Sequence, residues 1–95
     1  MVPKPASYRS KCRIYADILR AIQQTDKAKA TYLLHEANLS HERLIRHLEA
    51  LVDLGLIVKK VDDDGVVYAI TTKGSEYLAQ FRLVEKFGET FGIRV

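Results

Sequence analysis

Residues 29–57 read KATYLLHEANLSHERLIRHLEALVDLGLI and contain two amphipathic helical patterns separated by a very short break. In the second pattern apolar residues recur at helical intervals, so one face can pack while the opposite face stays polar. Ser40 is suited to cap this helix because its hydroxyl can accept a hydrogen bond from a free amide of the first turn. Gly55 suits the left-handed residue that closes a helix. The sequence therefore predicts a helix over about residues 41–54.

A shorter amphipathic helix precedes this one, with Ala30, Leu33, Leu34 and Ala37 on its apolar face. Asn38 can adopt the positive φ angle that a tight turn demands. The turn then spans residues 37–40, which is too short for anything but a sharp corner. Two helices joined in this way form a helix-turn-helix.

The segments on either side complete a larger pattern. From about Ser10 to Gln24, apolar residues fall on one stripe and predict another helix. After Gly55 the residues LIVKKVDDDGVVYAI change to an extended pattern, and Asp-Gly is a strong signal for a tight hairpin turn. We expect strands at about 57–61 and 66–70. Three helices followed by a two-stranded hairpin form a winged helix-turn-helix, in the α+β class.

A last helix should begin at Thr71 or Thr72, and it carries more large apolar residues than a lone terminal helix can hide. Several follow alternating steps of four and three, as in a coiled-coil seam. A partner chain is the natural cover; the alternative is that the helix folds back on its own domain, which would bury its first half more easily than its second. The candidate dimerisation residues are Tyr77, Phe81, Val84, Phe87 and Phe91.

The length of 95 residues, 47% of them hydrophobic, is enough for one core. We expect a flexible basic arm over 1–9, a winged helix-turn-helix domain over 10–72, a dimerisation helix over 73–91 and a tail over 92–95. The sequence has neither a membrane-spanning run nor the apolar core of a secretory signal, which predicts a cytoplasmic protein. Cys12 is the only cysteine, so an intrachain disulfide is excluded.

Charge is distributed unevenly along the chain. The formal net charge is +3, but residues 1–60 carry a balance of +5 and residues 61–95 a balance of −2. The helix-turn-helix lies in the basic part, which is the arrangement expected when that part touches nucleic acid. A solvated surface can produce such a split by chance, so the charge gains weight only from its coincidence with the motif.

In a DNA-binding helix-turn-helix, the second helix enters the major groove and its first turns face the base edges. Arg43 and Arg46 are the best candidates because a guanidinium can contact guanine in two places or bind a phosphate. The alternative is that each arginine is a solvated partner of Glu42, Glu49 or Asp53. The full set of candidates on this helix is Ser40, His41, Glu42, Arg43, Arg46 and His47.

Three lysines outside this helix are further candidates. Lys29 lies at the beginning of the shorter helix, and Lys59 and Lys60 lie in the first strand of the hairpin. Because side chains alternate along a strand, only one of the strand lysines can point at DNA. The hairpin tip, residues 62–64, is three aspartates in succession, which phosphates should repel. Either the wing stays clear of DNA, which we favour, or its acidic tip faces a protein.

An enzymatic function has little support, because no nucleophile–base pair, glycine-rich phosphate loop or metal-ligand cluster is visible. His41 and His47 are six residues apart and cannot share one helix face as a metal pair would. The segment DDDGVVYAIT lacks the later acidic ligand of an EF-hand loop. We therefore expect neither metal nor cofactor.

Three pieces of the chain, Ala37–Ser40, Leu54–Ile57 and Tyr68–Gly74, carry a resemblance to known proteins. Over about Arg13 to Val84, the sequence resembles the small archaeal winged-helix DNA-binding proteins that dimerise through a C-terminal helix in an antiparallel coiled coil. The last two pieces also resemble the MarR-type and PadR-type regulators. The resemblance implies a DNA-binding homodimer, transcriptional or chromatin-associated, with the contacts on residues 40–47. The chain departs from these relatives in its acidic wing and in a shorter terminal helix.

Two functions remain open at this point. The first is a homodimer that binds double-stranded DNA through the recognition helix. The second is a winged-helix module that binds protein instead, because a fold does not fix a function. The modest net charge and the acidic wing favour the second somewhat, and the basic helix-turn-helix favours the first.

Overall fold

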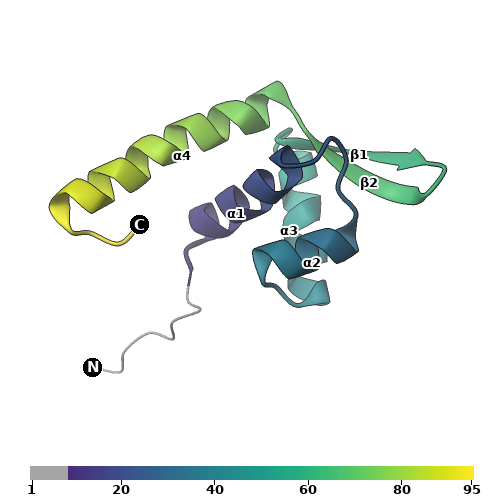
Figure 1. The fold of residues 1–95 in the computed structure, drawn as a ribbon, viewed down its shortest axis with the longest axis horizontal. Coiled ribbons are helices and arrows are strands. Elements are labelled where there is room, and N and C mark those ends of the chain that lie inside the picture. The colour runs from purple at the N-terminus through teal and green to yellow at the C-terminus, as the bar shows by residue number, and fades with distance from the viewer. Residues whose placement is uncertain (1–8) are drawn as a thin grey trace.

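The computed structural model describes residues 9–95, so almost all of the predicted N-terminal arm lies outside the described residues. The elements follow the order α1 (Lys11–Gln23), α2 (Ala30–Ala37), α3 (His41–Asp53), β1 (Ile57–Asp62), β2 (Gly65–Ile70) and α4 (Thr72–Phe91). The three short helices form one body, the hairpin projects from it, and α4 runs back alongside α1 (Figure 1). The predicted winged helix-turn-helix fold with a C-terminal helix is confirmed.

The corner between α2 and α3 forms as the sequence predicts. Asn38 has a φ of 53°, and its amide donates to the carbonyl of Leu34, which closes α2. Ser40 then caps α3, since its hydroxyl accepts a hydrogen bond from the Arg43 amide at 3.3 Å. A short polar side chain at each of these positions satisfies backbone groups that the helix ends leave free. The orientation of α3 is therefore set by local chemistry.

The core lies between the three helices and the base of the hairpin. Leu44, Leu48 and Leu51 of α3 are at most 1% exposed, as the helical spacing predicts. They pack in one cluster with apolar residues from every other element, including Ile57 of β1 and Leu78 of α4. Within residues 9–95, no helix is both long and apolar enough to cross a membrane.

The hairpin is antiparallel, with Ile57 paired to Ile70 at its base and Asp62 to Gly65 at its tip. Ala28, in the loop before α2, forms an isolated antiparallel β-bridge with Tyr68 of β2. The Ala28 amide donates to the Tyr68 carbonyl at 2.9 Å, and the Tyr68 amide donates to the Ala28 carbonyl at 2.8 Å. These two bonds tie the hairpin to the helical body close to its base.

Two of the pieces that carry the family resemblance interlock at the hairpin base, where α3 ends and α4 begins. Thr71 caps α4 by accepting from the Gly74 amide at 3.0 Å, and its hydroxyl donates to the carbonyl of Gly55 at 2.7 Å. The ammonium group of Lys73 donates to the carbonyl of Leu54 at 2.8 Å. Residues of the Tyr68–Gly74 piece therefore satisfy carbonyls that the end of α3 leaves free.

Gly74 is required at this junction by space. A Cβ atom built on it would lie 2.7 Å from Cγ1 of Ile70 and closer still to the carbonyl oxygen of Leu56. That oxygen already accepts a hydrogen bond from the Thr71 amide at 3.1 Å. Real side chains do not approach so closely, so only glycine lets α4 start against Leu56 and Ile70.

Helix α4 is attached to α1 by a polar clasp and an aromatic contact. The Glu85 carboxylate pairs with both Arg13 and Arg20 of α1, and Nη1 of Arg13 lies 2.5 Å from its Oε2. The Tyr77 hydroxyl donates to the Cys12 carbonyl at 2.8 Å. Phe81 lies below these groups, with the Arg13 guanidinium 5.1 Å from its ring centre, and is only 6% exposed. Helix α4 thus folds back on its own domain from Tyr77 as far as Glu85.

The second half of α4 is different, because its apolar side chains are left uncovered. Gly92, with a φ of 69°, ends the helix, and the chain turns back so that the Ile93 amide donates to the Gly88 carbonyl at 2.7 Å. This return covers Gly88 and brings the Val95 carbonyl within 3.3 Å of Nη2 of Arg13. Four large apolar residues remain between 45% and 65% exposed: Leu83, Val84, Phe87 and Phe91.

Candidate nucleic-acid interface

The start of α3 presents the predicted candidates to solvent. Ser40, His41, Glu42, Arg43 and Arg46 are all exposed, and His47 is half-buried. Arg46 Nη2 lies 3.3 Å from Glu42 Oε1, but both side chains are more than two-thirds exposed, so this pair is weak and readily broken. Lys29 is also exposed, at the N-terminal end of α2.

His47 is the least exposed of these residues because it leans on α1. Its ring packs edge-to-face with the Tyr15 ring, with 5.6 Å between the ring centres and an interplanar angle of 79°. Desolvation lowers the pKa of His47 below 6.5, and the positive charges of Arg43, Arg46, Lys11 and Arg9 lower that pKa further. The imidazole is therefore neutral at pH 7, in a positive field.

Two of these four cations already interact with a partner in the structure, one of them only weakly. Arg9 donates to Asp17 Oδ2 at 2.8 Å and to the carbonyl of Asn38 at 3.0 Å, so it connects α1 to the corner before α3. Arg46 is paired with Glu42. Lys11 and Arg43 are exposed and form no ion pair within residues 9–95.

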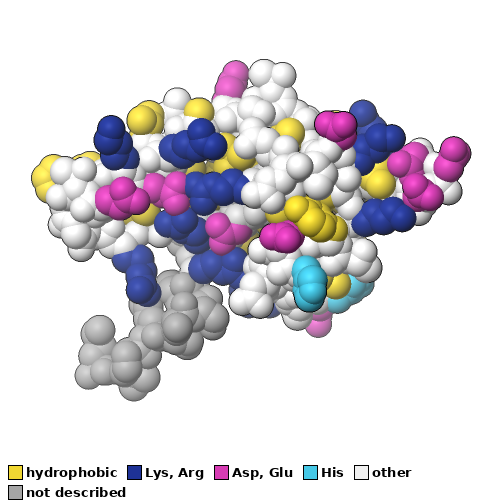
Figure 2. All heavy atoms as spheres, viewed as in Figure 1, with side chains coloured by type: hydrophobic (Ala, Val, Ile, Leu, Met, Phe, Trp, Pro, Cys, Tyr) yellow, Lys and Arg dark blue, Asp and Glu magenta, His cyan; other side chains and the backbone are white. Residues whose placement is uncertain are grey.

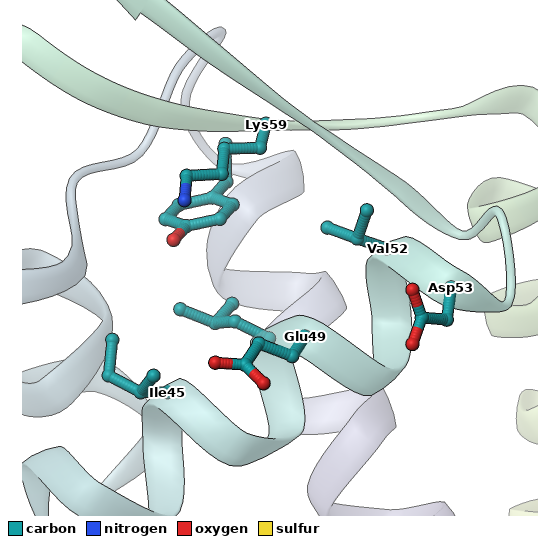
Figure 3. Close-up of a pocket in the computed structure, with 7 residues that line it drawn as sticks. Ile45, Glu49, Val52, Asp53 and Lys59 are labelled. Atoms are coloured by element: carbon teal, nitrogen blue, oxygen red, sulfur yellow. The ribbon is translucent and has the colours of Figure 1, made fainter.

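On its other flank α3 faces the wing across an open groove of about 350 Å³. Figure 3 shows Lys59 reaching from the hairpin toward Glu49 of α3. Lys60 lies on the opposite face of the strand, so the lysine that faces α3 is Lys59. The groove is lined by Ile45, Leu48, Glu49, Val52, Asp53, Lys59 and Tyr68.

Tyr68 is a lining residue that the sequence reasoning did not select. It is paired across the hairpin with Lys59 and is only 6% exposed. Desolvation raises the pKa of its hydroxyl, and the nearby Glu49 carboxylate raises that pKa further. The sequence could have indicated Tyr68 only through its pairing with Lys59 across the hairpin, and that pairing depends on the register of the two strands.

The wing tip is acidic in the structure, as in the sequence. Figure 2 shows Asp and Glu side chains gathered at the outer end of the hairpin. Asp62 accepts a hydrogen bond from the Asp64 amide at 2.8 Å, and Lys27 lies 3.5 Å from its carboxylate. The bond from the Asp64 amide, followed by the interaction with Lys27, lowers the pKa of Asp62. The Asp62 carboxylate is therefore ionised at neutral pH.

The candidate dimerisation residues divide into two groups. Phe81 is buried against α1 and Tyr77 is half-buried, with the two rings stacked 6.3 Å apart. Val84, Phe87 and Phe91 are exposed, and the rings of the two phenylalanines lie 4.8 Å apart. Among residues 9–95, no group of three or more His, Cys, Asp or Glu side chains is placed to hold a metal ion.

Comparisons with known proteins agree with this architecture. The chain superposes on the structure of Sso10a-2, a DNA-binding protein from Sulfolobus solfataricus, with a TM-score of 0.79 and 26% identity, covering 87% of this chain and 85% of that one. It matches the transcriptional regulator BldR from the same organism with a TM-score of 0.71 and 20% identity, over 84% of this chain but 60% of that one.

The oxidised form of MarR from E. coli gives a TM-score of 0.71 at 19% identity, covering 90% of this chain and 75% of that one. These two regulators show a shared fold. No curated protein sequence matches the chain significantly. A family model described as winged helix-turn-helix matches residues 8–89, nearly the whole chain. The chain therefore belongs to the winged helix-turn-helix family.

Proposed function

We propose that the chain binds double-stranded DNA as a homodimer, through the N-terminal half of α3, in a transcriptional or chromatin-associated role. The observation that carries this proposal is the exposed start of α3, where Arg43 and Arg46 project from a helix held rigidly by the Asn38 corner and the Ser40 cap. A helix in this position can enter the major groove, and arginine suits both guanine edges and phosphates. The DNA-binding relative from Sulfolobus solfataricus supports the same reading.

The homodimer rests on α4. Val84, Phe87 and Phe91 are about half exposed or more, which is costly for three large apolar side chains on one helix. A second copy of the same helix would bury all three, and it would place two copies of α3 on one duplex. Because Phe81 is already covered by α1, we assign the contact to the second half of α4.

Fluorescence anisotropy with random-sequence duplex DNA tests the DNA contact. We expect affinity to fall steeply with salt, because bound phosphates release counterions. Arg43→Ala/Arg46→Ala should weaken binding by roughly tenfold or more. The matched control is Arg82→Ala, which removes an exposed arginine from α4. If the intact chain binds DNA and the double variant binds it with the same affinity, the assignment of the contact to α3 is excluded.

Sedimentation equilibrium tests the dimer separately. The intact chain should sediment as a dimer, and Phe87→Ser/Phe91→Ser as a folded monomer, since both side chains are outside the core. An intact chain that stays monomeric at high protein concentration would exclude the α4 interface.

A second candidate function is protein binding without DNA binding. It is favoured by the acidic residues of the wing and of the C-terminal half of α3. Glu49 and Asp53 line the groove beside the wing, and Val61 at the hairpin end is 78% exposed. This function predicts no salt-dependent binding of duplex DNA by a correctly folded chain.

A further inference from the structure

We propose that Lys11 at the start of α1, together with Arg43 and His47 of α3, binds the phosphodiester backbone of DNA on the flank of the recognition helix that faces away from the wing. The proposal rests on the proposed function and adds a second contact surface to it. We call these three residues the α1-side patch.

The patch is a place where positive charge converges from two elements. Tyr15 lies one turn after Lys11 on α1, and His47 lies one turn after Arg43 on α3. The contact between the Tyr15 and His47 rings therefore brings the first turn of α1 alongside the first turn of α3. The charged groups that act on His47 are cations from both elements, Lys11 and Arg9 from α1 and its cap region and Arg43 and Arg46 from α3, with no carboxylate among them.

The cations of the patch are available for a ligand. Of the four positive groups around His47, Arg9 is held by Asp17 and the Asn38 carbonyl, and Arg46 is paired with Glu42 only through a weak, exposed contact. Lys11 and Arg43 have no ion-pair partner within residues 9–95. Two uncompensated cations beside a third, titratable group favour an anion with several oxygens, which is the chemistry of a phosphate.

The scaffold under the patch is ordered. The hydrogen bond from Arg9 to the Asn38 carbonyl fastens the start of α1 to the corner of the helix-turn-helix. Tyr15, only 9% exposed, holds the imidazole of His47 from below. A phosphate that binds here would order only the side chains of Lys11 and Arg43, which keeps the entropic cost low.

The opposite flank of α3 is poorly suited to a phosphate. His47 and Ile45 point about 160° apart around the helix, since each residue turns it by about 100°. On the Ile45 flank, the groove contains the carboxylates of Glu49 and Asp53 beside one ammonium group, that of Lys59. The three aspartates of the wing tip lie beyond it. The DNA backbone is therefore attracted to the α1 side and repelled on the wing side.

A phosphate at the patch would also couple binding to protons. It would neutralise the cations that hold the pKa of His47 down, so that pKa would rise in the complex. The complex would then carry more protons than the free protein, and affinity must increase as the pH falls toward and below 6.5. His35, an exposed residue of α2 outside the candidate set, serves as the comparison residue.

The test uses the full chain and random-sequence duplex DNA, with affinities measured by fluorescence anisotropy over a salt series at pH 7.5 and at about one unit below the ordinary histidine pKa. We compare Lys11→Gln with Lys86→Gln, which removes an equally exposed lysine from α4. Lys11→Gln should lower the slope of log affinity against log salt by about 0.9, the value for one lost phosphate contact, while Lys86→Gln leaves it unchanged. His47→Gln should remove most of the pH dependence, and His35→Gln none of it.

The outcomes separate this inference from the proposed function. If the intact chain binds but Lys11→Gln keeps the full salt slope, or loses no more than Lys86→Gln, the patch is not a phosphate site and the proposed function stands. If a folded intact chain does not bind duplex DNA at low salt, both fail. Lys11 is exposed and outside the core, so its variant tests the inference even where His47→Gln folds poorly.

Discussion

Replacing Gly74 by alanine would test whether α4 is seated on the hairpin base by close approach of the backbone. The new methyl group would have to occupy space that the Leu56 carbonyl and the Ile70 side chain already fill. The Leu56 carbonyl cannot retreat freely, because it holds the Thr71 amide and the Leu56 and Ile57 side chains next to it are buried in the core. The start of α4 must therefore move away from the Leu56 carbonyl.

The magnitude follows from three contributions. Overpacking of a filled site costs about 1–3 kcal/mol, and loss of the hydrogen bond to the Leu56 carbonyl adds about 1 kcal/mol. Alanine in place of glycine inside a helix returns about 1 kcal/mol. The net loss is about 1–3 kcal/mol, and for a domain of this size each kcal/mol lowers Tm by about 4–8 °C.

Urea unfolding followed by circular dichroism measures this loss directly. Glu76→Ala is the matched control, because Glu76 is exposed in the same turn of α4 and its loss should change stability by less than about 0.5 kcal/mol. A Gly74→Ala protein as stable as the control would refute the reasoning, since it would show that the methyl group fits. A large loss in both variants would point to the helix rather than to the contact.

Three further predictions concern other parts of the fold. Asn38→Ala should cost about 1–2 kcal/mol in urea unfolding because alanine resists the left-handed conformation, whereas Asn38→Gly should cost much less. Glu85→Gln should cost about 1–2 kcal/mol at pH 7, a value between those of surface and buried pairs. Desolvation raises the pKa of Glu85, but hydrogen bonds from Arg20 and Arg13 outweigh it and leave that pKa below 4.5. The stability lost in Glu85→Gln should therefore shrink as the pH falls through this lowered pKa. Acid titrations of the intact chain and of Glu85→Gln would show this. The lowered pKa of His47 means that stability is complete above pH 6.5 and declines as the pH falls below it, and thermal scans of His47→Gln should lack this decline.

The helix-turn-helix and the hairpin could be predicted because their signals are local. Ser40 and Gly55 bound α3 within one residue of its observed end, and Asn38 has the predicted positive φ. The Asp-Gly pair lies at the tip of the hairpin, with strands one residue longer at the turn than expected. Each of these features depends on neighbours a few residues away, so the pattern itself contains the information.

The parts that escaped prediction depend on long-range contacts. Glu85 is 72 residues from Arg13, and no spacing rule connects them. Phe81 fits a coiled-coil seam and an intrachain contact equally well, since both use one face of the same helix; the structure places it against α1. The α1-side patch shows the same limit, because the charge of Lys11 acts on His47 only after Tyr15 of α1 packs against His47 of α3.

The interlock at the hairpin base has a consequence for how this chain can change. Thr71, Lys73 and Gly74 close the base from outside, and Ala28 holds the strand just above it. The turn at residues 62–65 is therefore not needed to orient α4. Residues could be added or removed at that turn, in laboratory variants or in related genomes, while the positions of the recognition helix and the C-terminal helix are retained. The hairpin end is thus the natural place to attach a fluorescent label or a short epitope.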